Sequence, residues 1–399
     1  MRALKVRIEG DYWDSIIYND KLMLVTGEGT MEVYPWDKLV GLLISRHPDL
    51  ELQLHHLLRR GRAWYALGIQ DLMGHPASRS TLLAMADAAA GADLLISRKQ
   101  LVAHRKAVVD VALFPTTDLE CYGSKLFVGS TDGLQVAALN SIKELELSSD
   151  ATVFDGPCLR LAASYKRLAI ALGQEGLSET TAVGYPRDPD LSPFSYSMRQ
   201  ISKQWADSCG WAGSDLVATH RGAGGYVGAF ERPERRDSEE RFHQPDLVAT
   251  VTSDRIFSAT GGSLIASGGT VALIEGSSIS SRSWNPFRQT EGGPIADRQG
   301  PLKTESFRDG LGILDAGLAV FGAVVEYDTR MVVHGTDGKR RSIDGEVVNW
   351  RIFPRSMRYV NQLHLVKERW LDVHAFFHDY FVPAAKRGVG AKRPSASTW

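Results

Sequence analysis

A short pattern that recurs at a nearly constant spacing is the feature of this sequence that most restricts its fold. Each copy has small or turn-forming residues, an optional Lys or Arg, and a leucine that opens an apolar or alternating run, usually closed by a glycine. The seven leucines are Leu22, Leu126, Leu168, Leu216, Leu264, Leu318 and Leu365. Five of their six separations lie between 42 and 54 residues, close to the roughly 40 to 50 residues of a four-stranded propeller blade. The spacing predicts seven structural units, none of which buries its faces alone.

Turn chemistry supports the same interpretation. The chain has 38 glycines in 399 residues, nearly one in ten, against a usual share of about 7%, and they follow no triplet period. Copies such as 19–27 and 123–129 place an apolar run between tight turns, which is typical of a strand with apolar neighbours on both sides. We therefore expect an all-β ring of short strands.

The spacing and the turns resemble those of the β-propeller superfamily, of the WD-repeat or quinoprotein-like kind. The stretch Val33-Tyr-Pro-Trp36-Asp37 is similar to the WD dipeptide of that superfamily, whereas none of the copies has its Gly-His pair. The resemblance implies a seven-bladed β-propeller with a small helical insertion after the first blade. It carries over no functional residue. The alternative is a two-domain α+β or β-sandwich protein with a similar density of turns.

A propeller must also close its ring, because the first and last blades would otherwise expose free strand edges. Residues 4–8 alternate in the manner of a strand and precede the first copy. We predict that they complete the last blade beside strands near 362–366 and 373–377.

One interval of 104 residues, from Leu22 to Leu126, is too long for a blade. Within it, Leu54, Leu57, Leu58, Trp64 and Leu67 follow a near-helical spacing. We interpret this stretch as a helical insertion; the alternative is a distorted blade with long loops. The expected organisation is a first blade and ring-closing strand (1–44), the helical insertion (45–107), the remaining blades (108–382) and a basic flexible tail (383–399).

Composition excludes several classes of protein. The chain is 43% hydrophobic, with 46 basic and 47 acidic residues, which excludes disorder over the whole chain. Three widely spaced cysteines, Cys121, Cys158 and Cys209, favour a reducing compartment over a disulfide framework. The first residues lack the apolar stretch of a secretion signal. A cytoplasmic protein without a membrane span is the expectation.

Charge is unevenly distributed. Residues 351–399 hold nine basic and three acidic residues, and residues 45–107 hold nine and five. Arginines interleaved with aromatic residues can contact phosphates and stack on bases. The candidate nucleic-acid-binding residues are Arg351, Arg355, Arg358, Lys386, Arg387, Lys392 and Arg393. The alternative is that the aromatic residues near these arginines are blade core and that the arginines are solvated.

Local signatures of chemistry are weak. His374 and His378 have the spacing of metal ligands on a helix, with His364 or Asp379 as a possible third ligand, but Ala375 stands where a zincin has glutamate. The sequence has no CxxC, GxSxG or GxxxxGK[ST] pattern. We therefore expect no catalytic, cofactor-binding or metal-binding residues, although a site assembled across blades would leave no local pattern.

The favoured hypothesis is a non-enzymatic protein-interaction platform, a propeller subunit of a larger assembly. Its partner would be another protein, bound through blade loops and through Leu57, Trp64 and Tyr65 of the insertion. Two alternatives stay open: a nucleic-acid-associated subunit that uses the basic C-terminal segment, and an enzyme with its site in the propeller funnel.

Overall fold

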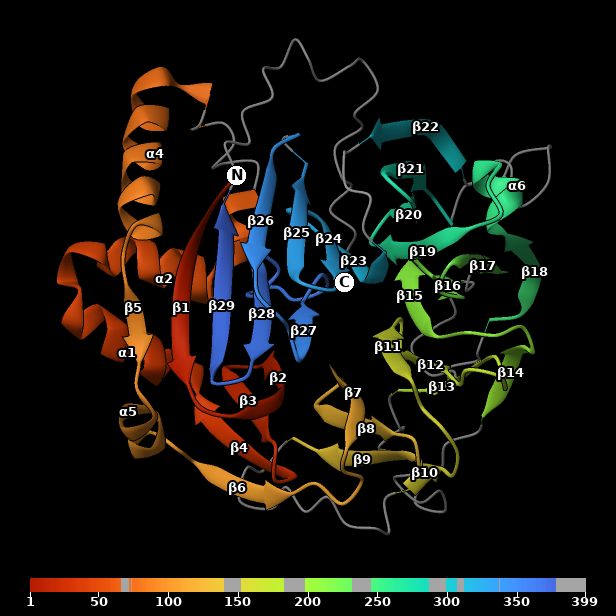
Figure 1. Ribbon diagram of the computed structural model, residues 1–399, viewed down its shortest axis with the longest axis horizontal. Coiled ribbons are helices and arrows are strands. Elements are labelled where there is room, and N and C mark those ends of the chain that lie inside the picture. Colours follow the sequence, from red (N-terminus) through yellow and green to blue (C-terminus); the bar gives the residue numbers. More distant parts are fainter. Residues whose placement is uncertain are drawn as a thin grey trace, which may run out of the picture.

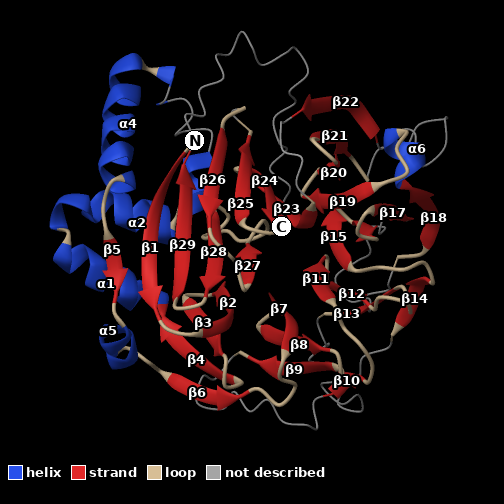
Figure 2. Ribbon diagram, viewed as in Figure 1, coloured by secondary structure: helices blue, strands red, loops and turns tan. Residues whose placement is uncertain are grey.

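The chain forms a ring of small β-sheets, the arrangement of a β-propeller (Figure 1). The computed structural model describes residues 1–65, 72, 74–139, 152–182, 198–231, 245–286, 299–306, 312–336 and 338–377. Helices gather on one side of the ring, apart from α6 (Ser253–Phe257) on the opposite side (Figure 2). None of the helices in the described ranges is long and apolar enough to cross a membrane.

Three four-stranded blades follow one another in the first half of the chain. The first has the order β2(Tyr12–Tyr18), β3(Lys21–Thr26), β4(Thr30–Pro35), β6(Ala107–Asp110). The second comprises β7(Thr116–Tyr122), β8(Lys125–Ser130), β9(Leu134–Ala138) and β10(Thr152–Phe154). The third comprises β11(Arg160–Ser164), β12(Arg167–Ala171), β13(Leu177–Thr181) and β14(Arg199–Ser202).

The second half holds one large sheet and two more blades. The large sheet contains β15(Ser208–Ala212), β16(Asp215–Thr219), β17(Ala223–Phe230), β18(Leu247–Thr252), β19(Gly262–Ser267), β20(Thr270–Glu275), β21(Ser278–Trp284) and β22(Gln299–Ser306). The next blade has β23(Ile313–Ala319), β24(Gly322–Tyr327), β25(Arg330–Gly335) and β26(Arg340–Asp344). The last has the order β27(Asn349–Ile352), β28(Gln362–Lys367), β29(Trp370–Phe377), β1(Arg2–Glu9), β5(Leu94–Ile96).

The expectation of seven separate blades is wrong. The described ring has five separate blades and one eight-stranded sheet, in which β17 pairs in parallel with β19. The join consists of two pairs, Ala223 with Gly262 and Gly224 with Ser263. Gly224 and Gly262 have φ values of +87° and +85°, a conformation that glycine adopts without steric cost. A sequence period reports how often strands recur, and it does not reveal whether neighbouring sheets stay apart.

The predicted ring closure is confirmed. β1 pairs antiparallel with β29 over its whole length, from Arg2 opposite Phe377 to Glu9 opposite Trp370. Leu4, Val6 and Ile8 are buried on one face of β1. The N-terminal strand therefore completes the blade made by the last strands of the described chain.

Tight hairpin turns explain the recurring pattern. The turns 19–20 and 165–166 have positive φ at both central residues, as does the turn at Gly123 and Ser124, which is the requirement of a type I′ hairpin. The leucine that follows each turn lies in the next strand, as Leu22 does in β3. The small or turn-forming residues of the pattern are thus the central residues of these hairpins.

The same turns bind neighbouring blades together. The backbone N–H of Ser124 donates to the Tyr18 hydroxyl at 3.3 Å, and that of Lys166 donates to the Tyr122 hydroxyl at 3.0 Å. The N–H of Asp20 donates in the same way to Tyr359 at 3.2 Å. A tyrosine of one blade thus receives the first hairpin of the next.

The helical insertion lies inside the first blade, between β4 and β6, and not after it. It contains α1(Trp36–Arg46), η1(Pro48–Leu50), α2(Glu51–Arg59), η2(Gly61–Tyr65), α4(Pro76–Ala90), strand β5 and α5(Arg98–Ala103). β5 pairs in parallel with β1, and α4 contacts β1 along the outer side of the last blade (Figure 1). α5 begins with a capping box in which Ser97 and Gln100 bond each other's backbone N–H.

The largest apolar cluster joins the first blade, the insertion and the last blade. Trp36, Leu54, Leu57 and Leu58 of the insertion are fully buried in it, and burial of such a side chain contributes about 2 kcal/mol. Two backbone carbonyls of α2 are also bound by the last blade: Asn361 donates to Leu57 at 3.1 Å and Gln362 donates to Leu58 at 3.0 Å. The insertion is therefore fixed to the ring as an integral part of its core.

Candidate functional site

The strands that line the middle of the ring bring charged side chains together. β2, β7, β11, β15, β19, β23 and β27 contact one another in that order, and β27 contacts β2. Four of these strands carry an Asp or Asn at an equivalent position: Asp14, Asp118, Asp315 and Asn349. Each side chain accepts the backbone N–H of the residue that follows it, at 2.6 to 2.8 Å. This local bond fixes the direction in which the side chain leaves its strand.

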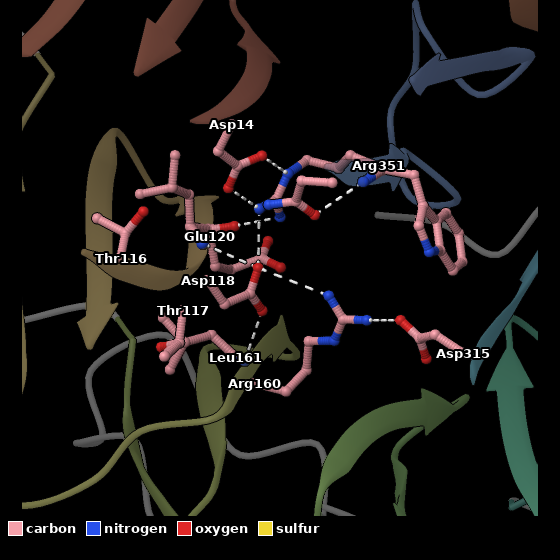
Figure 3. A network of polar contacts seen from close by, with 12 residues as sticks. Asp14, Thr116, Thr117, Asp118, Glu120, Arg160, Leu161, Asp315 and Arg351 are labelled. Atoms are coloured by element: carbon pink, nitrogen blue, oxygen red, sulfur yellow. Dashed lines mark hydrogen bonds and ion pairs between the residues drawn. The ribbon is translucent and has the colours of Figure 1, made fainter. Parts of the chain in front are cut away.

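Arg351 of β27 is the cation that joins two of these carboxylates (Figure 3). Its Nη2 atom lies 2.6 Å from Asp14 Oδ2 and 2.8 Å from Asp118 Oδ1, and its Nη1 donates to the Leu119 carbonyl at 2.6 Å. Its side chain is only 11% exposed, and both aspartates are buried. One guanidinium thus connects the last blade to the first and second blades.

A second arginine, Arg160, pairs with a carboxylate of a more distant sheet. Arg160 of β11 forms an ion pair with Asp315 of β23 and lies 4.0 Å from Asp118. The other oxygen of Asp118 accepts the backbone N–H of Leu161 at 2.7 Å. Figure 3 shows the Arg160 and Asp315 side chains pointing toward each other. Because β11 and β23 belong to sheets that are not neighbours, this pair spans the middle of the ring.

Two glutamates near these aspartates are also bound by side chains from other segments of the chain. Arg355 contacts both carboxylate oxygens of Glu120 at 3.1 Å, and the Trp350 indole N–H donates to Glu326 at 2.8 Å. The acidic groups in the middle of the ring are therefore already bound by groups from other strands.

The environment shifts the pKa of several of these groups. Burial raises the pKa of Asp14, and Arg351 opposes that shift. Burial likewise raises the pKa of Glu120, against Arg355. Burial alone would lower the pKa of Arg351, but Asp14 and Asp118 raise it above its ordinary value. Asp14 and Asp118 thus favour the charged form of the guanidinium, and Arg351 in turn favours the charged form of Asp14.

His364 lies next to this network and is buried as a neutral ring. Its Nδ1 is 3.1 Å from the Ser15 hydroxyl and its Nε2 is 3.2 Å from Gln362 Oε1. Burial, with Arg351 as the second cause, lowers its pKa to about 3. Both ring nitrogens have partners within the protein, so this histidine is already used in the core.

This arrangement of ion pairs can hold the blades in place. Its charged groups form ion pairs with one another. The described residues include no group of three or more His, Cys, Asp or Glu that could hold a metal ion. His374 is buried in β29, a strand and not the helix that the ligand spacing requires, while His378 and Asp379 lie outside the described residues.

Of the partner-binding residues predicted from the sequence, the structure describes the side chain of Leu57 alone. Leu57 is fully buried, because α2 turns this face toward the last blade, so its side chain cannot contact a partner. Trp64 and Tyr65 lie in η2, and their side chains lie outside the described part of the chain.

The predicted nucleic-acid-binding arginines also separate. Arg351 is held inside the ring and Arg355 is paired with Glu120, whereas Arg358 is exposed. Lys386, Arg387, Lys392 and Arg393 lie outside the described residues. The aromatic neighbours Trp350, Phe353 and Tyr359 are buried, as the alternative interpretation expects. Its second part, that the arginines are solvated, holds for Arg358 but not for Arg351 or Arg355.

Sequence reasoning missed the central carboxylates. A signal was present: Asp14 and Asp118 each precede an anchoring leucine by eight residues, and Arg160 stands at the same distance before Leu168. Aligning the copies over that longer window would have placed all three side chains at one position of the inner strand.

A separate hollow of about 210 Å³ lies at the eight-stranded sheet. Its wall includes Trp205, whose ring stacks on His220 with 5.5 Å between centroids. Tyr226 and Asp254 also line it. Its described wall holds one carboxylate, from Asp254, and one imidazole, from His220, and this pair alone favours no particular ligand.

Several solved structures are similar to this chain at low sequence identity. The computationally designed Ika8 protein is 10% identical, covering 94% of this chain and 100% of that chain, with a TM-score of 0.41. The WD40 domain of Pan2 from Neurospora crassa is 8% identical (92% and 89% covered, TM-score 0.40). BamB from Moraxella catarrhalis is 11% identical (90% and 80% covered, TM-score 0.41).

The chain is a β-propeller. The ring of sheets and its closure by β1 carry that statement, and the predicted resemblance is confirmed to that extent. No family model matches the sequence, and no curated protein matches it. Likeness at these identities and TM-scores carries no inference about activity or partners.

Proposed function

We propose that this propeller is a non-enzymatic protein-interaction platform, a subunit that binds another protein through its insertion and blade loops. The observation that carries the proposal is the pairing of the central charges. Asp14 and Asp118 share Arg351, and Asp315 is paired with Arg160 across the ring. General acid–base catalysis requires a group that is free to exchange a proton with a substrate, and these groups are engaged with each other.

A platform must also present its surface without deformation, and the insertion meets that requirement. Glu32 of β4 is buried and binds Arg98 of α5 through both oxygens, at 2.6 and 2.8 Å, while Arg105 donates to it at 2.6 Å. The Trp36 indole donates to the Leu58 carbonyl at 2.8 Å. Rigid surfaces lose little conformational entropy on binding.

Apolar side chains are available near the insertion. Leu52 of α2 is 52% exposed and Met357 of the β27–β28 loop is 56% exposed. We propose Trp64 and Tyr65 as contact residues from the sequence. Leu57 is buried, so we propose the exposed Leu52 and Met357 as the apolar contact residues in its place. The cytoplasm remains the proposed compartment, since all three cysteines are free thiols.

The test is affinity capture of the tagged full chain from its native cells, with and without nuclease, read by mass spectrometry. We expect a stoichiometric protein that survives nuclease and is lost from a Leu52→Glu/Met357→Glu variant. The matched control is Val248→Glu/Leu302→Glu, which changes two exposed apolar residues on the opposite part of the ring. Recovery of the chain alone would contradict the platform, and a partner lost only on nuclease treatment would favour the nucleic-acid alternative.

A further inference from the structure

Strand β22 is the longest strand at the outer edge of a described sheet. It has eight residues, whereas the other outer edge strands, β5, β6, β10, β14, β18 and β26, have three to six. It lies at the outer border of the ring (Figure 1), and residues 301–306 are all exposed. Within the described part of the chain it pairs with β21 alone. Its other edge therefore presents backbone N–H and C=O groups that a further strand can bind.

The register shows which residues of β22 present these groups, because successive residues of a strand turn their backbone groups to opposite edges. The N–H of Trp284 in β21 donates to the carbonyl just before β20 at 2.6 Å, so the odd-numbered residues of β21 turn to β22. Those residues pair with Lys303 and Glu305. The Ser280 and Thr304 hydroxyls lie 3.1 Å apart, which is typical of a close pair without backbone bonds. The residues whose backbone groups point to the free edge are 302, 304 and 306.

Two charged side chains of β22 have no partner of their own. Lys303 and Glu305 are exposed and share one face of the strand, because they are two residues apart. The residues opposite them in β21 are Ser281 and Ile279, which carry no charge. Among the described residues, neither charged group takes part in an ion pair or a hydrogen bond. A lone lysine discourages pairing at a sheet edge, but a lysine and a glutamate in this order are complementary to their own antiparallel copy.

We propose that β22 pairs antiparallel with β22 of a second copy of this chain, about a two-fold axis at Thr304. In this register Lys303 lies opposite Glu305 of the second copy, and Glu305 lies opposite its Lys303. Backbone bonds join Thr304 to its own equivalent, and residue 302 to residue 306, with two hydrogen bonds in each pair. The charged pairs fall on the positions between, where opposite side chains approach most closely. The same edge serves both copies, as a closed two-fold dimer requires.

The charges of β22 select this register over its neighbours. A shift by two residues in one direction places Lys303 opposite Lys303, and a shift in the other direction places Glu305 opposite Glu305. Like charges directly opposite each other destabilise a strand pair. A strand from another protein could use the same backbone groups, but the order of charges in β22 matches its own copy. The inference is therefore independent of the proposed function, which concerns another protein and another part of the surface.

The test is sedimentation velocity of the full chain over a series of concentrations, because a short edge contact gives weak and reversible association. The variants are Lys303→Glu, Glu305→Lys and the double variant Lys303→Glu/Glu305→Lys. The matched controls are Lys99→Glu and Glu28→Lys, which make the same changes of charge at exposed positions elsewhere. Circular dichroism and the unfolding midpoint verify that each variant is folded.

We expect the wild type and the controls to dimerise, and each single variant to dimerise at least ten times more weakly, because like charges then face each other twice. The double variant should dimerise as the wild type does, since its charges are exchanged but still paired. A mixture of Lys303→Glu and Glu305→Lys should form heterodimers, because one copy carries two glutamates at these positions and the other carries two lysines.

A wild type that stays monomeric, equal dimerisation by the single variants and their controls, or no heterodimer from the mixture would each overturn the inference. Thr304→Pro tests the backbone contact separately, since it removes an N–H that points to the free edge, and it should weaken dimerisation at least tenfold. If the wild type is monomeric and Thr304→Pro loses a protein that the wild type captures, the edge binds a foreign strand and the second copy is wrong. The proposed function fails on a different result, the capture of no other protein, whether or not the chain dimerises.

Discussion

Arg160 and Asp315 form an ion pair across the middle of the ring, although their strands, β11 and β23, belong to sheets that are not neighbours. The pair is one part of a network in which Arg351 binds Asp14 and Asp118. A propeller held only by contacts between adjacent blades could open at any one of them. The central network adds bonds between blades on different sides of the ring.

The first prediction concerns Arg351. Replacing it by methionine removes the cation that two buried aspartates share, and uncompensated buried charge is costly. We expect Arg351→Met to lower the free energy of unfolding by about 3 to 5 kcal/mol, measured by urea denaturation at pH 7. The comparison is Arg355→Met, whose side chain is 33% exposed and whose loss should cost only about 1 kcal/mol. Similar losses for the two variants would contradict a special role for Arg351.

The second prediction concerns acid stability. Burial is the main cause that lowers the pKa of His364 and of His374 to about 3, from 6.5. A pKa that is lowered on folding means that the unfolded chain binds the proton more tightly. The contribution of each neutral histidine to the free energy of unfolding is therefore fully present above pH 6.5. It is lost as the pH falls toward 3, by about 1.4 kcal/mol per pH unit for each histidine.

His374 permits a direct test of that statement. Both of its ring nitrogens are buried without a hydrogen-bond partner in the described structure. We expect His374→Leu to be as stable as the wild type or more so at pH 7, because the unpaired polar atoms are removed. Its free energy of unfolding should also fall less steeply between pH 6 and pH 4. His75→Leu, at an exposed position, should leave the pH dependence unchanged.

The third prediction concerns the contact between the insertion and the last blade. A Cβ atom at Gly61 would overlap Asn361, whose Nδ2 binds the Leu57 carbonyl at 3.1 Å. We expect Gly61→Ala to destabilise the protein by about 1 to 3 kcal/mol. Gly312→Ala is the control, since nothing lies within 4 Å of the added Cβ. An unchanged urea midpoint for Gly61→Ala would show that the close contact is not needed.

The fourth prediction concerns Glu32. Burial would raise the pKa of its carboxyl group, but hydrogen bonds from Arg98, Tyr34 and Arg105 lower it to about 2. We expect Glu32→Gln to cost about 2 to 4 kcal/mol, because it removes the negative partner of two arginines. The loss should be largest at α5, where hydrogen exchange of residues 98–103 should accelerate relative to β7. Lys99→Gln, exposed on the same helix, should leave exchange unchanged.

The pH dependence of that contribution has a definite sign. A carboxyl whose pKa is lowered on folding stabilises the protein above its unfolded pKa of about 4.5. The contribution of Glu32 is lost as the pH falls from 4.5 toward 2. The difference in stability between the wild type and Glu32→Gln should therefore narrow in acid.

Much of the fold could be predicted from the sequence, because hairpin turns and alternating strands are local. All seven anchoring leucines lie in strands, and residues 4–8 pair with β29 as predicted. The leucines do not mark the same strand in every copy. Leu216 lies in β16, the strand that follows the inner strand β15, whereas Leu264 lies in β19, which is itself an inner strand. A pattern of turn and leucine fits any strand that follows a tight turn, so it could not fix the position of a strand within its sheet.

The candidate site was much harder to predict. Arg351 looked like one of three equivalent basic residues, yet its side chain enters the ring, while Arg358 lies on the surface. Leu57 looked like part of an apolar contact surface, yet α2 turns it into the core. Alternation and helical spacing tell which residues share a face, and they do not tell which neighbour covers that face.

The sequence by itself thus determined the β-propeller, its repeated hairpins and the closing role of β1, since each depends on short-range turn chemistry and on burial along a strand. The tertiary structure alone decided how many sheets remain separate and which charges meet. Two backbone pairs between β17 and β19 join what the period shows as two units. Arg160 and Asp315 meet only because closing the ring brings β11 and β23 to its middle.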